Sequence, residues 1–200
     1  MADAYHHGDL RRALLDEAAA VLDAEGVAAL SLRDLARRAG VSATAPYHHF
    51  PSKAALVTAL AEDAMAELDA ALAEADRASA AAGGDPGARL SALGVAYVLY
   101  AIDHPARFRL AFRPEMGDPF ERLVERGELP EDTVGFRQLV RVVREVEPAP
   151  ERQLVTAVGA WSVAHGLAAL LVDGPLRALA ADRDRVRALA EAVLYDPTEG

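Results

Sequence analysis

The sequence contains no cysteine, and only 6% of its 200 residues are aromatic. The missing cysteine excludes a disulfide-stapled fold, a thiolate metal site and a cysteine nucleophile. Basic residues are also few: the sequence has 21 Lys and Arg and 31 Asp and Glu, which gives a formal net charge of −10. At first this balance argues against a nucleic-acid partner, since phosphate is bound by Lys and Arg.

Signals for β-strands are also missing. No stretch of strand length alternates apolar and polar residues, and the β-branched cluster at 140–146 lies inside a helical pattern. Alanine, the best helix former, occupies 45 of the 200 positions. The length suffices for one domain, or two small ones, with a buried core. The composition therefore predicts an all-α globular protein.

No targeting segment is visible, since residues 1–9 are polar and include no apolar core of a signal peptide, and we expect a cytoplasmic protein. The stretch 154–172 lacks Asp, Glu, Lys and Arg over 19 residues, which is long enough to span a membrane. It contains Thr156, Ser162 and His165, and no basic cluster flanks it. We therefore favour a buried core helix over a membrane span and expect no membrane partner.

Hydrophobic periodicity, capping residues and Gly or Pro punctuation predict nine to ten helices. In the N-terminal part they are expected at 8–25, at 31–39, somewhere in 42–49, and from 52 toward 80. A Gly- and Pro-rich linker follows at 82–87. Beyond it, helices are expected at 88–103, 105–112, 119–126, 132–146, 150–172 and 183–194.

The segment from Ser31 to Lys53 reads SLRDLARRAGVSATAPYHHFPSK and predicts a helix-turn-helix. Ala36 is small, as a close crossing of two helices requires, and Gly40 can take the positive φ of the turn. Pro46 is expected to face inward onto the first helix. Because proline has no N–H, it belongs in the first turn of its helix, which places the helix start near residues 43–44.

The outward side chains of the second short helix suit a DNA duplex. Thr44 can hydrogen-bond a base edge or touch a thymine methyl, and Tyr47 can donate to a phosphate. Lys53 lies in the first turn of the next helix, where free N–H groups and a cation can both engage phosphate. The alternative is a solvated surface on an unrelated helical corner. The candidate DNA-contacting residues are Arg33, Ser42, Ala43, Thr44, Tyr47, His48, His49 and Lys53.

With these motifs the stretch at about 8–60 resembles the TetR family of bacterial transcriptional repressors. The resemblance rests on LRDLARRAGVS and on YHHFPSK. The second segment fits the family's pattern at Tyr47, His49, Phe50 and Lys53. The sequence departs from that pattern at Pro46, where the family usually has Leu, and this alters the recognition helix.

The resemblance implies a three-helix helix-turn-helix DNA-binding domain at residues 1–60 and a helical bundle for effector binding and dimerisation at residues 61–200. The implied partners are a near-palindromic double-stranded DNA operator, an apolar small-molecule effector and a second copy of the chain. Effector binding would release a repressor from its operator. No catalytic residue, metal or cofactor is expected.

In the C-terminal part, WSVAHG at 161–166 resembles the tryptophan–histidine–glycine motif of one C-terminal subtype of the family. Trp161 and His165 lie one helical turn apart and can touch, either as a core contact or as part of a ligand site. The aromatic residues upstream leave the same two alternatives open. If a cavity exists, its candidate lining is Tyr97, Tyr100, His104, Phe108, Phe112, Met116, Phe136, Trp161 and His165.

The stretch 154–172 also predicts a dimer surface. Apolar residues recur there at steps of four and three, a narrow seam that packs helix against helix. The seam consists of Leu154, Val158, Trp161, His165, Ala168 and Val172, and beside it lies a small-residue face of Gly159, Ser162, Gly166 and Ala169. Together with 186–194 this predicts two helices per chain packed across a twofold axis.

Two other classes of protein remain as alternatives. A helical enzyme would use His104 beside Asp103, or His165 near Thr156, but no phosphate loop, metal-ligand cluster or nucleophile motif accompanies them. The other alternative is a ligand-binding or membrane-surface protein that no longer binds DNA.

The negative charge is unevenly distributed along the chain. Residues 1–53 have a formal net charge of −1, and residues 54–200 have −9. The DNA-reading part is thus near neutral and can be basic on its contact face, so the total charge does not exclude DNA. We expect weak, salt-sensitive non-specific binding and recognition that depends on shape and on the dimer.

Overall fold

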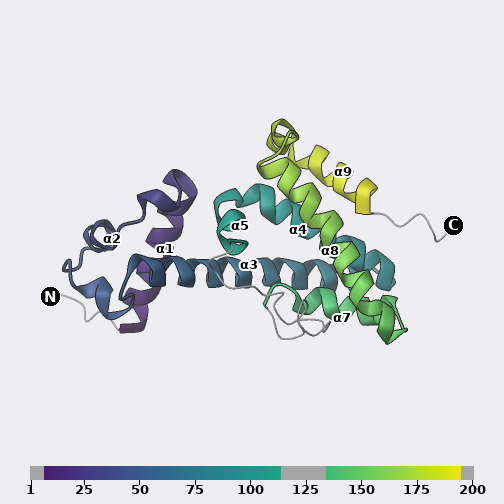
Figure 1. Ribbon diagram of the computed structural model, residues 1–200, viewed down its shortest axis with the longest axis horizontal. Helices are drawn as coiled ribbons and strands as arrows, with labels where there is room; N and C mark the ends of the chain where they lie inside the picture. Colours follow the sequence, from purple (N-terminus) through teal and green to yellow (C-terminus); the bar gives the residue numbers. More distant parts are fainter. Residues whose placement is uncertain (1–6, 114–133, 195–200) are drawn as a thin grey trace. The chain divides into compact units, whose positions relative to one another are not determined.

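The computed structural model describes residues 7–113 and 134–194, with side chains from residue 10 onward (Figure 1). All regular structure in these residues is helical, as the composition predicts, and comprises eight α-helices and three short 3₁₀ helices. The expected total of nine to ten is not reached there. The helix expected at 119–126 lies outside the described residues, and the expected recognition helix is a 3₁₀ turn.

The helices form two compact units. The first contains the described residues up to Ala64 together with residues 106–113, and the second contains Met65–Pro105 and the described residues from 134 onward. One continuous helix, α3 (Lys53–Ala81), contributes residues to both units.

The first unit is built from α1 (His7–Glu25), η1 (Val27–Ala29), α2 (Leu32–Arg38), η2 (Ala45–His48), the start of α3 and α5 (Pro105–Ala111). Its core consists of apolar side chains at helical spacing on α1, α2 and α3. Leu110 of α5 joins this core, and Arg107 of the same helix pairs with Asp23 of α1 at 2.8 Å. A segment from the middle of the chain therefore completes the N-terminal unit.

The recognition segment differs from its expected form. It is a single 3₁₀ turn that begins at Ala45, whereas an α-helix of about one and a half turns was expected from residues 43–44. Pro46 lies in the first turn of this segment, where its missing N–H costs no helical hydrogen bond, and its ring is buried. The Tyr47 amide donates to the Thr44 carbonyl at 3.2 Å and the His49 amide to the Pro46 carbonyl at 3.0 Å, which are 3₁₀ bonds, and the Phe50 amide also donates to the Pro46 carbonyl at 2.8 Å.

Most other helix boundaries agree with the expected ones, because local capping fixes them. The Ser52 hydroxyl accepts from the Ala55 amide at the start of α3, and the Asp85 carboxylate accepts from the Ala88 amide at 2.8 Å. The Asp85 cap moves the start of α4 (Pro86–Asp103) two residues ahead of the expected Ala88. The helix α7 (Arg137–Val146) begins later than expected, after a turn in which Gly135 has a φ of 90°.

The second unit packs α4 against α7, α8 (Pro150–Val172) and α9 (Arg183–Leu194). A further 3₁₀ helix, η4 (Arg177–Ala181), follows α8. Val98, Leu171 and Val186 are fully buried where α4, α8 and α9 meet. The helices of this unit are therefore arranged around α4.

The helix α8 is long and apolar enough to cross a membrane by length and composition, a test that core helices also pass. In the structure one of its faces is buried against α4, while the other remains open. The open face includes the predicted small-residue face, of which Gly159, Ser162, Gly166 and Ala169 are all exposed. The neighbouring seam is divided: Ala168 and Val172 are buried within the chain, Leu154, Trp161 and His165 are partly buried, and Val158 is 37% exposed.

Candidate nucleic-acid interface and ligand cavity

The turn between α2 and η2 has the geometry that the sequence predicts. Gly40 has a φ of 68°, and the Val41 amide donates to the Ala36 carbonyl at 3.0 Å. Ala36 is only 1% exposed, so a larger side chain would not fit at this crossing. The expectations for Gly40, Ala36 and the inward-facing Pro46 are confirmed.

The turn and η2 present a short row of exposed side chains. Ser42, Ala43, Thr44 and His48 are exposed, and Tyr47 is 45% exposed although it is a large aromatic residue. His49 is only half-buried, and Ser42 and Thr44 share a hydrogen bond between their hydroxyls at 3.3 Å. The structure thus brings most of the predicted reading residues together on one outward surface.

Two cations flank this row. Lys53 is the first residue of α3, and its ammonium donates to the Ala28 carbonyl at 2.9 Å. That bond holds the lysine close to the free N–H groups of the helix start, where phosphate binds favourably. Arg33 lies exposed on α2.

Sequence reasoning missed a third cation, Arg11. Its guanidinium lies over the ring of Phe50, 5.4 Å from the ring centroid, so α1 holds a positive charge beside the residues that follow η2. The basic pair Arg11-Arg12 in the first helix was the available signal for it.

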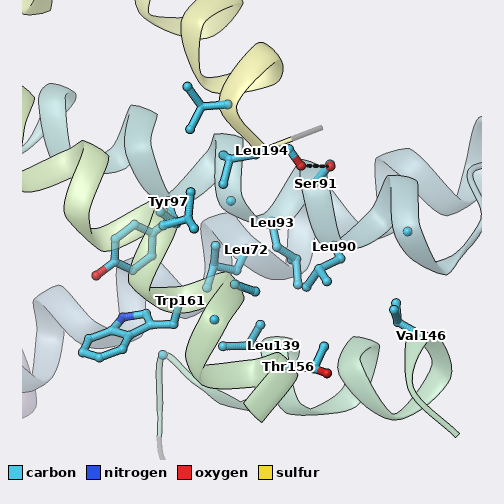
Figure 2. A pocket seen from close by; sticks show the side chains of 18 residues that line it. Leu72, Leu90, Ser91, Leu93, Tyr97, Leu139, Val146, Thr156, Trp161 and Leu194 are labelled. Atoms are coloured by element: carbon cyan, nitrogen blue, oxygen red, sulfur yellow. Dashed lines mark hydrogen bonds between the residues drawn. The ribbon is translucent and has the colours of Figure 1, made fainter. Parts of the chain in front are cut away.

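The second unit contains an apolar cavity of about 370 Å³ that is partly open to solvent, since Val163 and Val193 of its lining are 45% and 44% exposed (Figure 2). Side chains from α3, α4, α7, α8 and α9 line it, and Figure 2 shows Tyr97 and Trp161 near one end and Thr156 and Val146 near the other. Leu194 of α9 lies at its edge, where the Ser91 hydroxyl donates to the Leu194 carbonyl at 2.6 Å.

Only part of the predicted ligand-contacting set meets at this cavity. Tyr97 and Trp161 line it, and His165 and Phe136 contact these two residues. The Tyr97 hydroxyl and His165 Nδ1 are 2.7 Å apart in a hydrogen bond, and the Phe136 ring meets the Trp161 ring edge-on, with 5.7 Å between their centroids. This cluster is both core packing and cavity wall, so the two alternatives left open for Trp161 and His165 are not exclusive.

The other predicted residues lie elsewhere. Tyr100 and His104, with ring centroids 5.0 Å apart, line a wider open groove along α3, α4 and α9. Phe108 and Phe112 belong to the first unit, where their rings contact each other, and they do not line the cavity. Met116 lies outside the described residues. The helical spacing of these aromatic residues in the sequence could not show which of the two units each helix packs into.

Burial disfavours the charged forms of Tyr97, which lines the cavity, and of His165, which contacts it. Loss of solvation raises the pKa of the Tyr97 hydroxyl far above its ordinary value, and it lowers the pKa of the His165 imidazole below its ordinary value of 6.5. Neither group therefore carries a charge at neutral pH. Among the described residues no group of three or more His, Asp or Glu could hold a metal ion.

Comparison with known proteins agrees with this geometry. Residues 14–60 match the family model described as "Bacterial regulatory proteins, tetR family", and residues 90–194 match "Tetracyclin repressor-like, C-terminal domain". No curated protein matches the chain.

Several solved structures share the fold across nearly the whole chain. A protein of unknown function from Rhodococcus sp. RHA1 is 36% identical over 97% of both chains, with a TM-score of 0.71. The TetR family transcriptional regulator PfmR from Thermus thermophilus is 26% identical over 90% of this chain and 96% of its own, with a TM-score of 0.56. A TetR variant from Acinetobacter baumannii AYE, solved in complex with minocycline, is 18% identical over 96% of this chain and 95% of its own, with a TM-score of 0.56.

Proposed function

Because this chain belongs to the TetR family of bacterial regulatory proteins and is a transcriptional regulator with a ligand-binding C-terminal domain, we propose that it is a repressor released from a palindromic operator by a small molecule. The observation that carries the proposal is the exposed row around η2. Thr44, Tyr47 and His48 are exposed beside a turn in which Gly40 has a φ of 68° and Pro46 is buried.

We assign a base contact to Thr44 and backbone contacts to the residues around it. Thr44 is exposed at the start of η2, and its methyl and hydroxyl can read a base edge in the major groove. Tyr47 and His48 donate to phosphate, as do Lys53 at the start of α3 and Arg33 on α2. Ser42, Ala43 and His49 complete the predicted contact set. The division into a DNA-binding domain at 1–60 and an effector domain at 61–200 is part of this proposal.

The homodimer forms through the open faces of α8 and α9. Val155, Val163 and Leu170 are 73%, 45% and 43% exposed on α8, and Val193 is 44% exposed on α9. A side chain added at Gly159 or Gly166 would meet nothing within 4 Å. Such a row of exposed apolar and small residues stabilises a protein when a second helix covers it. Two copies about a twofold axis place two η2 turns on one duplex, which requires a near-palindromic operator.

The effector binds in the cavity of the second unit. Trp161, which belongs to the motif that resembles the tryptophan–histidine–glycine subtype, forms its wall with Tyr97, and His165 of the same motif bonds to the Tyr97 hydroxyl from behind that wall. A small molecule releases the repressor only if it binds more tightly to the conformer that fits the operator poorly. We place this protein in the cytoplasm, where it meets chromosomal DNA.

The direct test measures fluorescence anisotropy of a labelled fragment from the intergenic region beside the gene, titrated with the full chain at several salt concentrations. We expect specific, salt-sensitive binding of two chains per fragment. Absence of binding to every fragment of that region would refute the proposal.

The base contact is tested with operator variants. Thr44→Ala should change the ranking of affinities among operators that differ by one base pair, because a lost base contact alters discrimination at that position by about 1–3 kcal/mol. An unchanged ranking, with all affinities lowered alike, would show that Thr44 touches only the backbone.

A further inference from the structure

We propose that the effector is an uncharged molecule, mostly hydrocarbon, whose polar group is met by the hydroxyl of Thr156. This inference rests on the proposed function, since it treats the cavity of the second unit as the effector site. It goes further because it names the chemical class that the cavity accepts and the classes that it rejects.

The first support is the composition of the wall. Eighteen of the described residues line the cavity, and none of these eighteen is Asp, Glu, Lys, Arg or His. Most are aliphatic side chains or glycines of α3, α4, α7 and α8, such as Leu72, Leu93 and Leu139. Burying a hydrocarbon against such a wall is favourable, whereas an ion placed there loses its hydration and finds no opposite charge. An acid or an ammonium ion is therefore rejected.

The second support is that several charged residues close to the wall are engaged with one another. Gly135 and Val146 line the cavity, and each lies close to ion-paired residues. The Gly135 amide donates to the Asp69 carboxylate at 3.2 Å, which also faces Arg137. Beyond Val146, the Arg89 guanidinium donates to Asp76 at 2.7 Å and to Glu145 at 3.1 Å. These carboxylates and guanidinium groups offer no counter-ion to a ligand.

The third support is the placement of the hydroxyls. Three hydroxyl-bearing residues line the cavity, and two of them are already bonded: Ser91 donates to the Leu194 carbonyl, and Tyr97 bonds to His165. None of the residues that the structure describes hydrogen-bonds the Thr156 hydroxyl. Thr156 lies near the opposite end of the cavity from Tyr97 in Figure 2. A ligand with one terminal polar group thus finds its partner at Thr156 and its apolar wall toward Trp161.

The chain provides its own reporter for a test. Trp161 is the only tryptophan in the sequence, and it lines the cavity. Its fluorescence can be titrated in the full-length protein at neutral pH with 1-decanol, decanoate and decylammonium. These probes share a ten-carbon chain and differ in the charge of the head group, and they are used below the concentrations at which they form micelles.

We expect 1-decanol to bind at least about tenfold more tightly than either ion, because an ion loses its hydration in this cavity. Binding of decanoate or decylammonium with equal or greater affinity would overturn the proposal, and so would failure of all three probes to bind. Thr156→Asp should reverse the preference, because it places a carboxylate in the cavity, and decylammonium should then bind more tightly than 1-decanol.

Thr156→Val is the matched control, since it keeps the shape of the side chain and removes only the hydroxyl. It should weaken the binding of 1-decanol by about three- to tenfold, which is the effect of one hydrogen bond. Both ions should still bind more weakly than 1-decanol. An unchanged affinity for 1-decanol in this variant would remove Thr156 from the proposal. An unchanged preference in Thr156→Asp would overturn the assignment of this cavity.

The proposed function is tested separately, by measuring DNA binding with the same protein preparation. If the protein prefers 1-decanol but binds no intergenic DNA, the ligand class stands and the repressor function falls. If the protein binds DNA but prefers an ion, only the ligand class falls.

Discussion

At the scale of single residues, Lys53 bonds to the Ala28 carbonyl in the structure and is proposed to contact a DNA phosphate. In the free protein its ammonium donates to the Ala28 carbonyl and thereby ties the start of α3 to η1. The same ammonium is proposed to meet phosphate. An internal bond of this kind restricts the lysine before DNA arrives, so less side-chain entropy is lost when phosphate binds.

Lys53 and Tyr47 should therefore differ in the salt dependence of DNA binding. Lys53→Ala removes a positive charge and with it one phosphate contact. The slope of a plot of the logarithm of affinity against the logarithm of salt concentration should therefore become shallower by about 1. Tyr47→Phe removes a neutral donor and should weaken binding with the slope unchanged. Anisotropy titrations over a salt series measure both, with thermal unfolding of each variant as the control for folding. A slope that Lys53→Ala leaves unaltered would place this lysine away from phosphate.

His165 should make stability depend on pH. Burial lowers its pKa in the folded state, so the unfolded chain binds the proton more readily as the pH falls through 6.5. The stability that neutral His165 contributes is thus complete above that value and is lost below it. We expect the unfolding temperature of the wild type to fall more between about pH 7 and pH 5 than that of His165→Gln, which cannot titrate. Parallel decreases would contradict this.

At the scale of helices, an ionic cluster joins α3, α4 and α7. Asp76 of α3 is the buried charged residue of the described chain, 3% exposed, and it pairs with Arg89 of α4 and Arg141 of α7. Glu145 of α7 pairs with Arg89 in turn. A buried carboxylate held in this way costs much when only one partner is removed.

Asp76→Asn should destabilise the protein by about 3 kcal/mol, because it removes the buried charge that pairs with both Arg89 and Arg141. Urea denaturation followed by circular dichroism measures the change. The matched control is Glu74→Gln on the same helix, whose pair with Arg77 is well exposed and should contribute little. Equal effects of the two substitutions would show that the cluster contributes no more than a surface pair.

The helices themselves were largely predictable from the sequence, since their boundaries depend on nearby residues. Ser52, Asp85 and Pro150 each mark a helix start through a local cap or a fixed φ. The form of η2 was not predictable, because the choice between a 3₁₀ turn and a short α-helix depends on how Pro46 is buried against α2. That burial is a tertiary contact, which periodicity does not report.

At the scale of the whole molecule, the open faces of α8 and α9 predict the assembly. Gly166→Glu should convert the dimer to monomers, because the twofold axis brings two like charges into a face built from small residues. Helix propensity favours Glu over Gly, so the fold should survive. Light scattering after size exclusion gives the mass. Ala80→Glu, an exposed site of the same charge change on α3, should remain dimeric. A dimer in both variants would exclude this face.

The candidate sites show the limit of sequence reasoning at this scale. The reading row was predictable because its residues are neighbours in the chain and its turn chemistry is local. The cavity was only half predictable: Tyr97 and Trp161 line it, but so do Thr156, Val193 and Leu194, which no motif marks. Phe108 and Phe112 share the aromatic character of the cavity wall, yet they complete the other unit. Side-chain chemistry predicts what a residue can contact, and packing decides which unit it joins.

The uneven charge of the chain also affects how many copies a cell needs. A near-neutral reading unit linked to a strongly acidic unit is held only weakly on DNA of random sequence, of which a genome offers roughly 10⁶–10⁹ sites. Few molecules are then sequestered away from the operator. If the protein is the repressor proposed above, a small number of dimers would suffice to keep one promoter silent, and each dimer released by the effector would diffuse away without being recaptured by neighbouring DNA.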